Sequence, residues 1–197
     1  MKATKIIPLV AAAALAYGSI AQGAIIDVVQ APTGYFVPND ALKYDSPYYR
    51  WYDDDWSWTH KPISGSISSA WLMVSAFDVD AAQGEVDQIW VNDNGTPVKL
   101  GDLAGANNAW NFTWFALPNN LFDDIGTGLN ATIKIDVNDD GWAVTLAKSE
   151  LCVNSSNQQQ CALNPNPGGG GTVPEPATLA LLGLGLAGMG WMRRQKK

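Results

Sequence analysis

The residues best suited to chemistry lie in one short acidic segment, residues 136–141, which reads Asp-Val-Asn-Asp-Asp-Gly. Oxygen-bearing side chains at its first, third and fifth positions, with glycine at the sixth, match the start of a calcium loop. The match ends there, because Ala147 stands where such a loop requires Glu. We expect either a calcium site built on Asp136, Asn138 and Asp140 or a solvated turn, which Asp, Asn and Gly also favour. Carboxylates that other loops could add to such a site are Asp78, Asp80, Glu85 and Asp87.

A second group of candidate binding residues is an aromatic cluster between positions 48 and 60. Tyr and Trp present flat apolar faces with a polar edge, a combination suited to stacking on sugar rings, and the neighbouring residues 53–55 are three aspartates that can accept hydroxyl hydrogen bonds. The alternative is that these rings pack in the core of the domain. The aromatic platform would consist of Tyr48, Tyr49, Trp51, Tyr52, Trp56 and Trp58, and the residues chiefly expected to contact carbohydrate are Trp51, Tyr52, Trp56 and Trp58.

The single histidine, His60, would have to serve any Ser-His-Asp or Cys-His arrangement. No Gly-x-Ser-x-Gly elbow and no cysteine-centred motif provides it with a partner. A pair of carboxylates acting on a glycosidic bond needs only a set separation, which the sequence leaves open. We expect a structural histidine at a strand end, bonded to a backbone group, and a body that is not an enzyme.

These side chains must be positioned by strands, because no stretch between Ile25 and Leu163 repeats apolar residues with a helical period. Short β-rich runs between turn signals predict an all-β fold, a single antiparallel β-sandwich of seven or eight strands. The run 67–79 is apolar on both faces, which predicts a central, covered strand. Asn94-Gly95 between two such runs predicts a hairpin. Further strands are predicted around 25–29, 86–91, 110–114, 132–137, 142–147 and 151–153.

The first 23 residues have the pattern of a secretory signal peptide. A short basic start is followed by an apolar run from Ile6 to Ala16. Small residues then stand at the −3 and −1 positions of two overlapping cleavage sites, one after Ala21 and one after Gly23. The sequence therefore predicts export but leaves the choice between these two cleavage sites open.

The last 25 residues form a second targeting segment with three parts. Pro174-Glu175-Pro176 is expected to stay extended, because proline fixes φ and lacks a backbone N–H. The uncharged run 177–192 is expected to be a transmembrane helix of roughly 24 Å, slightly shorter than a hydrocarbon core of about 30 Å. The basic end, with Arg193 and Arg194, is expected to stay on the cytoplasmic side.

This tail resembles the PEP-CTERM sorting signal of Gram-negative bacteria in its Pro-Glu-Pro triplet, its Leu/Gly-rich segment and its terminal Arg193-Arg194. The resemblance implies that an exosortase, a membrane-embedded cysteine transpeptidase-like enzyme, recognises the triplet and removes the helix. It also implies anchoring in the inner membrane before processing and delivery to the cell surface or extracellular matrix afterwards. The alternative is an ordinary C-terminal membrane anchor preceded by a chance Pro-Glu-Pro.

The body between these signals resembles the β-sandwich domain that often precedes this sorting signal. The resemblance implies a jelly-roll of the galactose-binding-like type and no single activity. We divide the chain into a signal peptide (1–23), a β-sandwich domain (24–163), a Pro/Gly linker (164–172) and the sorting signal (173–197). The segments that carry the resemblance of the body are 58–60, 78–80, 84–87, 100–103 and 136–142.

The charge and cysteine content agree with an exported domain. The formal net charge is −7, and six of the 12 Lys and Arg residues lie in the two signals. The body is therefore strongly acidic, which excludes nucleic acid as an expected partner and favours a divalent cation. In an exported protein, Cys152 and Cys161 are expected to form a disulfide. A metal-binding or catalytic thiol pair is the alternative, but it lacks nearby histidine ligands.

Together these features predict an exported, non-enzymatic surface or extracellular-matrix protein that associates with exopolysaccharide. The alternatives are a carbohydrate-binding module and a calcium-dependent adhesin. Calcium is the single cofactor that the sequence suggests, and the expected partners are an exosortase-type processing enzyme, the inner membrane during export and exopolysaccharide.

Overall fold

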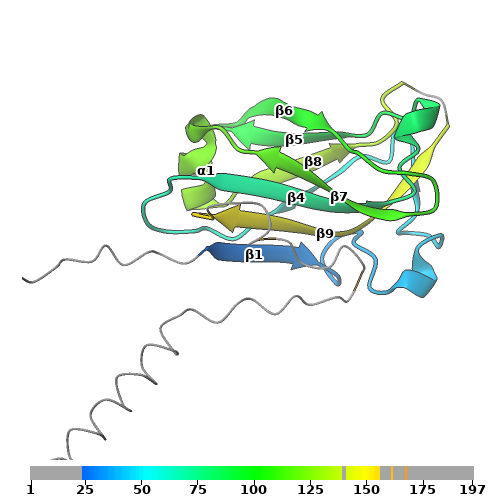
Figure 1. Cartoon of the computed structure of the whole chain (residues 1–197), viewed down its shortest axis with the longest axis horizontal. Helices are drawn as coiled ribbons and strands as arrows, with labels where there is room; N and C mark the ends of the chain where they lie inside the picture. Colours follow the sequence, from blue (N-terminus) through cyan, green and yellow to red (C-terminus); the bar gives the residue numbers. More distant parts are fainter. Residues whose placement is uncertain (1–23, 139–140, 156–160, 162–166, 168–197) are drawn as a thin grey trace, which may run out of the picture.

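The computed structural model describes residues 24–138 and 141–155 together with Cys161 and Pro167. In this part of the chain, nine strands form two antiparallel sheets, accompanied by one short α-helix and three 3-10 turns (Figure 1). The expectation of an all-β sandwich is confirmed, with more strands than predicted. The finer expectation of a jelly-roll stays a prediction.

The larger sheet has the strand order β1-β9-β4-β7, and the two-residue strand β2 pairs with the early part of β9. All of these pairings are antiparallel. The longest strand, β9, is therefore flanked by partners along both edges, and all of its residues are buried. The bounds are β1 Ile25–Gln30, β2 Arg50–Trp51, β4 Ala70–Phe77, β7 Trp110–Ala116 and β9 Ala143–Val153.

The smaller sheet has the order β3-β8-β5-β6. Its β5–β6 hairpin turns at Asn94 and Gly95, whose φ angles of 50° and 85° are those of a left-handed two-residue turn. The hairpin predicted at this dipeptide is thus confirmed. The bounds are β3 Trp56–Thr59, β5 Gln88–Asp93, β6 Thr96–Asp102 and β8 Asn130–Lys134.

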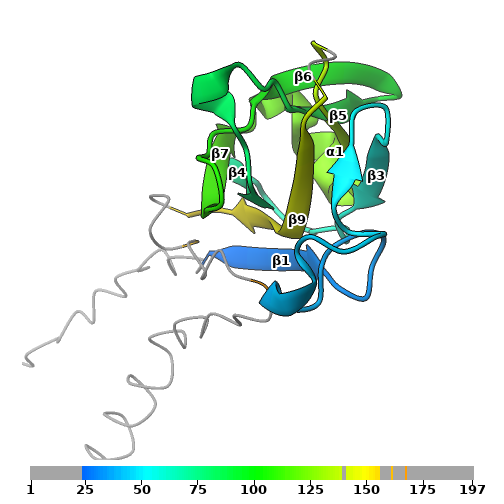
Figure 2. The same ribbon diagram turned by 90° about the vertical axis from the view of Figure 1, so that its right-hand side faces the viewer.

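The core lies between the two sheets, which face each other in Figure 2. Strand β4 contributes Leu72 and Val74 to it, and β5 and β8 contribute Ile89 and Ile133 from the opposite sheet; each is fully buried. Burying one such side chain stabilises the fold by about 1.5–3 kcal/mol. Met73, on the other face of β4, is also fully buried, so the predicted central, covered strand is confirmed.

A short helix, α1 (Phe122–Thr127), was not expected from the sequence. It follows a 3-10 turn at Asn119–Leu121 and closes one end of the sandwich with the buried side chains of Leu121 and Ile125. Six residues are too few to produce a periodic pattern that a sequence reading can recognise. The other 3-10 turns are Asp40–Leu42 and Ala81–Gln83.

The expected disulfide is present and joins Cys152 to Cys161, whose Cα atoms are 5.9 Å apart. Both sulfurs are buried against Met73 on the outer face of the larger sheet. The bridge therefore ties the segment after β9 to the sheet that β9 belongs to.

Both targeting segments lie outside the described residues, as do most of the linker and Asp140. The signal peptide, the predicted helix at 177–192 and its flanking residues therefore stay predictions in structural terms. Within the part of the chain that the structure describes, no helix is long and apolar enough to cross a membrane.

Candidate functional site

The main candidate site is a group of buried carboxylates at one end of the sandwich, at the right-hand side of Figure 1. Two segments meet there: the loop from β4 to β5, and the chain that leaves β8. The pairing of Gln88 with Lys134 brings them together, and Val137 N then donates a hydrogen bond to Val86 O over 3.0 Å. We call Asp80, Glu85, Asp87 and Asp136 the carboxylate cluster.

Each member of the carboxylate cluster has 3% or less of its surface exposed. Backbone amides hold one oxygen of three of them. Asp136 N donates to Asp87 Oδ1 over 2.9 Å, and Asp80 N donates to Glu85 Oε2. Asp136 Oδ2 accepts from the amides of Gly141 and Trp142 over 2.7 and 2.9 Å. These bonds fix the positions of the side chains.

Asp80 Oδ1 and Asp136 Oδ1 are buried without a hydrogen-bond partner, and the buried carboxyl groups of Glu85 and Asp87 hydrogen-bond to each other, which requires a proton on one of them. The ion pairs in the described part of the chain use Asp27, Asp40, Asp54 and Asp102 instead. Buried carboxylates without a countercharge are expensive, because burial removes them from water. These ion pairs supply no cationic side chain to the carboxylate cluster.

The electrostatics of the cluster reflect this burial. Loss of solvent raises the pKa of Glu85 and of Asp87, and each carboxyl also feels the charge of a neighbouring acid. Burial likewise raises the pKa of Asp80, with a further contribution from the charge of Asp78. Raised carboxyl pKa values mean that the protein environment favours either a proton or a cation at this place.

The structure gives a mixed outcome for the predicted calcium loop. Asp136 joins the carboxylate cluster, whereas Asn138 donates its amide to Gly84 O over 2.9 Å and Asp140 lies outside the described residues. Asp78, another candidate, has both oxygens occupied by Asn108 N and by the Tyr49 hydroxyl. Among the described residues, no three His, Cys, Asp or Glu side chains are already gathered as a metal-ligand set.

The expected carbohydrate-binding residues divide into two pairs. Trp51 and Tyr52 are exposed by 50% and 47%. Trp56 and Trp58 have only 8% and 3% of their surface exposed. Both pack edge-on against Phe36, at ring-centroid distances of 4.8 and 5.4 Å. Rings enclosed in this way cannot stack on a sugar. Trp56 and Trp58 are therefore core residues and not part of the proposed carbohydrate surface. Their alternation with Ser57 and Thr59 in β3 is the signal that could have shown this.

The aromatic surface includes Tyr49, which the sequence analysis placed in the aromatic platform, and extends to Tyr35 and Tyr44, which it did not select. Tyr44 packs against Tyr49 at 5.5 Å, and Tyr49 packs against Trp51 at 5.7 Å. Beside them, the Arg50 guanidinium lies 3.9 Å from the ring centroid of Tyr35. We call Tyr35, Tyr44, Tyr49, Trp51 and Tyr52 the aromatic surface. Its exposed rings are those of Tyr35, Tyr44, Trp51 and Tyr52. Arg50 is itself bonded to Asp54.

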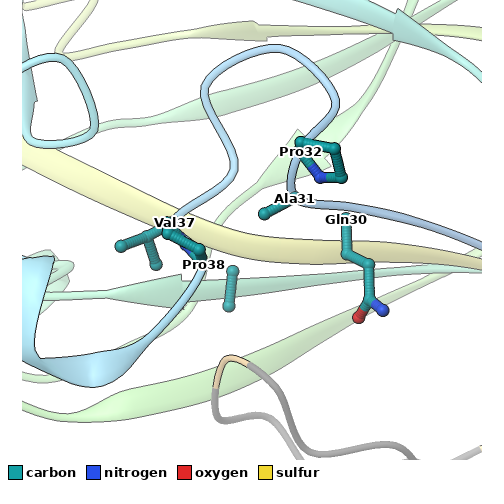
Figure 3. A pocket seen from close by; sticks show the side chains of 6 residues that line it. Gln30, Ala31, Pro32, Val37 and Pro38 are labelled. Atoms are coloured by element: carbon teal, nitrogen blue, oxygen red, sulfur yellow. The ribbon is translucent and has the colours of Figure 1, made fainter.

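Two small hollows share Gln30, Ala31 and Pro32 in their linings. One, of about 210 Å³, is shown in Figure 3 and takes its walls from the end of β1 and from Val37 and Pro38 of the following loop. The other, of about 320 Å³, includes Asp27 and Lys61. Neither hollow is lined by a member of the carboxylate cluster, and both are at or below the small end of ligand pockets.

His60 lies between an aspartate and a serine, an arrangement that the sequence did not predict. Its Nδ1 is 3.0 Å from Asp27 Oδ2, and its Nε2 is 2.9 Å from Ser149 Oγ. Asp27, His60 and Ser149 are therefore linked in the order aspartate, histidine, serine, as in a catalytic triad. Ser149, however, is fully buried on β9, on the face that packs into the core. A substrate carbonyl could not reach its hydroxyl in this conformation.

The C-terminal residues match a known protein-sorting motif. Residues 172–194 match the PEP-CTERM protein-sorting motif. The matched segment contains the Pro174-Glu175-Pro176 triplet, the apolar run, Arg193 and Arg194. The PEP-CTERM signal implies export and exosortase-mediated sorting to the surface, so the protein is an exosortase-targeted extracellular protein. No curated protein matches the chain.

Proposed function

We propose that this protein is a non-enzymatic component of the cell surface or extracellular matrix that associates with exopolysaccharide. The observation that carries the proposal is the sorting motif at residues 172–194, placed behind a folded body with two antiparallel sheets. An exosortase would recognise Pro174-Glu175-Pro176 while the segment 177–192 anchors the chain in the inner membrane. Its cut would then release the body for delivery to the exterior.

Two features of the body support a structural rather than catalytic role. The hydroxyl of Ser149, the serine beside His60, is enclosed in the core and has no access for a substrate. The two described hollows are small, and neither is lined by a member of the carboxylate cluster. We therefore propose that this body acts through a binding surface.

A carbohydrate-binding role is the second candidate, because the aromatic surface favours it. Trp51 and Tyr52 expose about half of their area next to Asp53 and Asp54. Exposed aromatic rings bordered by carboxylates match the alternating apolar faces and hydroxyl groups of a polysaccharide. The remaining alternative, a calcium-dependent adhesin, is supported by the carboxylate cluster.

The test of the sorting proposal is the variant Glu175→Ala in the native host. We expect this variant to stay in the membrane fraction at full length, because the processing enzyme no longer recognises its triplet. Asn166→Ala, in the adjoining linker, is the matched control and should be released like the unaltered protein. Mass spectrometry of protein recovered from the matrix reads both mature ends. Normal release of Glu175→Ala with an unchanged C-terminus would refute the proposal.

A further inference from the structure

We infer that the carboxylate cluster binds one divalent cation, Ca²⁺, with Glu85 and Asp87 as its charged ligands. The inference concerns the folded body alone. It does not depend on exosortase processing or on glycan binding, and those proposals would stand if it failed.

The first argument is the set of oxygens that the protein leaves without partners. Asp80 and Asp136 each keep one buried carboxylate oxygen without a hydrogen-bond partner, and the side chains of Glu85 and Asp87 are hydrogen-bonded to each other, which requires a proton between them. Buried polar atoms in native proteins are normally paired, so each exception indicates a missing partner. Two such oxygens beside a carboxyl pair that needs a proton indicate a place where positive charge is favoured.

The second argument is that the side chains are fixed in advance. Backbone amides of Asp80 and Asp136 hold Glu85 and Asp87 through one oxygen each, which fixes the position of both carboxyl groups. The carboxyl groups of Glu85 and Asp87 lie next to each other. Two carboxylates in contact can pair only through a proton or a cation, because neither has a hydrogen of its own to donate when ionised.

The third argument concerns the identity of the cation. All of the available donors are oxygens, and neither histidine nor cysteine takes part, so zinc and other soft metals are disfavoured. Calcium accepts six to eight oxygens in flexible geometry, including backbone carbonyls and waters, whereas magnesium demands a regular octahedron and keeps its waters. Since no three acidic side chains are gathered as a ligand set among the described residues, neutral oxygens and water would complete the shell around Glu85 and Asp87.

The position of the cluster defines what the cation would do. Asp87 directly precedes β5, and Asp136, 49 residues later in the chain, follows β8. A cation held by the first segment and attracted by the charge of the second would join two loops that the sheets alone leave linked by few hydrogen bonds. Binding would therefore stabilise the whole domain against unfolding, as any ligand of the native state does.

The test is thermal unfolding of the full-length protein in detergent, with calcium chloride or with EDTA. Saturating calcium should raise the melting temperature of the unaltered protein by roughly 5–10 °C relative to EDTA, and magnesium at equal concentration should raise it less. Equilibrium dialysis with radioactive calcium should give one bound ion per chain. No rise together with no retained calcium would overturn the inference.

Variants separate a cation site from a merely structural cluster. Glu85→Gln and Asp87→Asn keep the shape of each side chain but remove its charge, so each should lose most of the calcium-dependent rise. In EDTA the same variants should melt about as high as the unaltered protein, since an amide can take the place of the protonated carboxyl group in the Glu85–Asp87 hydrogen bond. Asp45→Asn, an exposed carboxylate, is the control and should keep the full rise. Equal destabilisation of Glu85→Gln and Asp87→Asn in EDTA and in calcium would show that these groups serve only as hydrogen-bond acceptors.

Discussion

The imidazole of His60 lies 3.0 Å from the carboxylate of Asp27, and this contact joins the end of β3 to the edge strand β1. Lys61 N donates to the same carboxylate oxygen over 3.0 Å. The hydrogen bond with His60 is the largest cause that lowers the pKa of Asp27, although burial acts in the opposite direction. The ionised form of Asp27 is therefore the one that the fold stabilises.

We predict that Asp27→Asn destabilises the domain by about 1.5–3 kcal/mol near neutral pH, because it removes a charge-assisted acceptor from two donors. A group whose pKa is lowered by folding stabilises the protein above its unfolded-state pKa, and this stability is lost as the pH falls through the folded-state value. The difference between the two proteins in urea unfolding should therefore be complete above pH 3.8, the ordinary value, and shrink in stronger acid.

A surface ion pair provides the control for this prediction. Lys99 and Asp102 approach to 2.7 Å but are both exposed. Asp102→Asn should change the free energy of unfolding by less than about 1 kcal/mol, since exposed pairs are screened by solvent. An Asp27→Asn effect that equals the Asp102→Asn effect at neutral pH would contradict a structural role for the His60–Asp27 contact.

The disulfide leads to a second prediction. Cys152 and Cys161 close a loop with a sequence separation of 9, so its loss should lower the free energy of unfolding by about 2–3 kcal/mol in the chain-entropy model. Replacing both cysteines by alanine and measuring urea unfolding tests this, with the reduced unaltered protein as a parallel sample. If the double variant is as stable as the oxidised protein, the bridge does not constrain the unfolded chain.

The strand pattern was predictable where one face of a strand is apolar and the other polar. The hairpin at Asn94-Gly95 and the central strand β4 follow directly from turn chemistry and hydrophobic runs. Strand β9 was harder, because the run 148–150 places Lys148, Ser149 and Glu150 in its middle. Sequence patterns treat such residues as exposed, and only the folded sheet reveals that all three are buried.

The candidate site was predictable only in part, because its residues are distant in sequence. Asp136 was selected for its calcium-loop spacing, and Glu85 and Asp87 were named as carboxylates from other loops. Their meeting depends on the antiparallel pairing of β5 with β8, which no local pattern specifies. The contact of His60 with Ser149 spans 89 positions and was invisible for the same reason.

The aromatic surface leads to a third prediction, with Trp51 and Trp56 as a matched pair. Trp51→Ala should leave the free energy of unfolding nearly unchanged, since half of its area is exposed, and should abolish the change in tryptophan fluorescence on titration with exopolysaccharide. Trp56→Ala should cost about 3–5 kcal/mol, as removal of a buried ring does. An unaltered protein without any fluorescence response, or a Trp51→Ala variant with the full response, would contradict glycan contact at this surface.

Gly34 leads to the last prediction, because its backbone and its surroundings both require glycine. Its φ angle is +53°, and a Cβ atom at this position would lie 2.8 Å from a ring atom of Trp56. We expect Gly34→Ala to destabilise the domain by about 1–3 kcal/mol, since the enclosed ring must shift to accept the methyl group.

Gly126, in α1, is the matched control, because a Cβ there meets nothing within 4 Å and its φ angle is not left-handed. Gly126→Ala should stabilise the domain by up to about 1 kcal/mol through the higher helix propensity of alanine. Urea unfolding of the two variants should therefore give shifts of opposite sign, and shifts of the same sign would show that the packing of Trp56 against the loop that contains Gly34 does not limit stability.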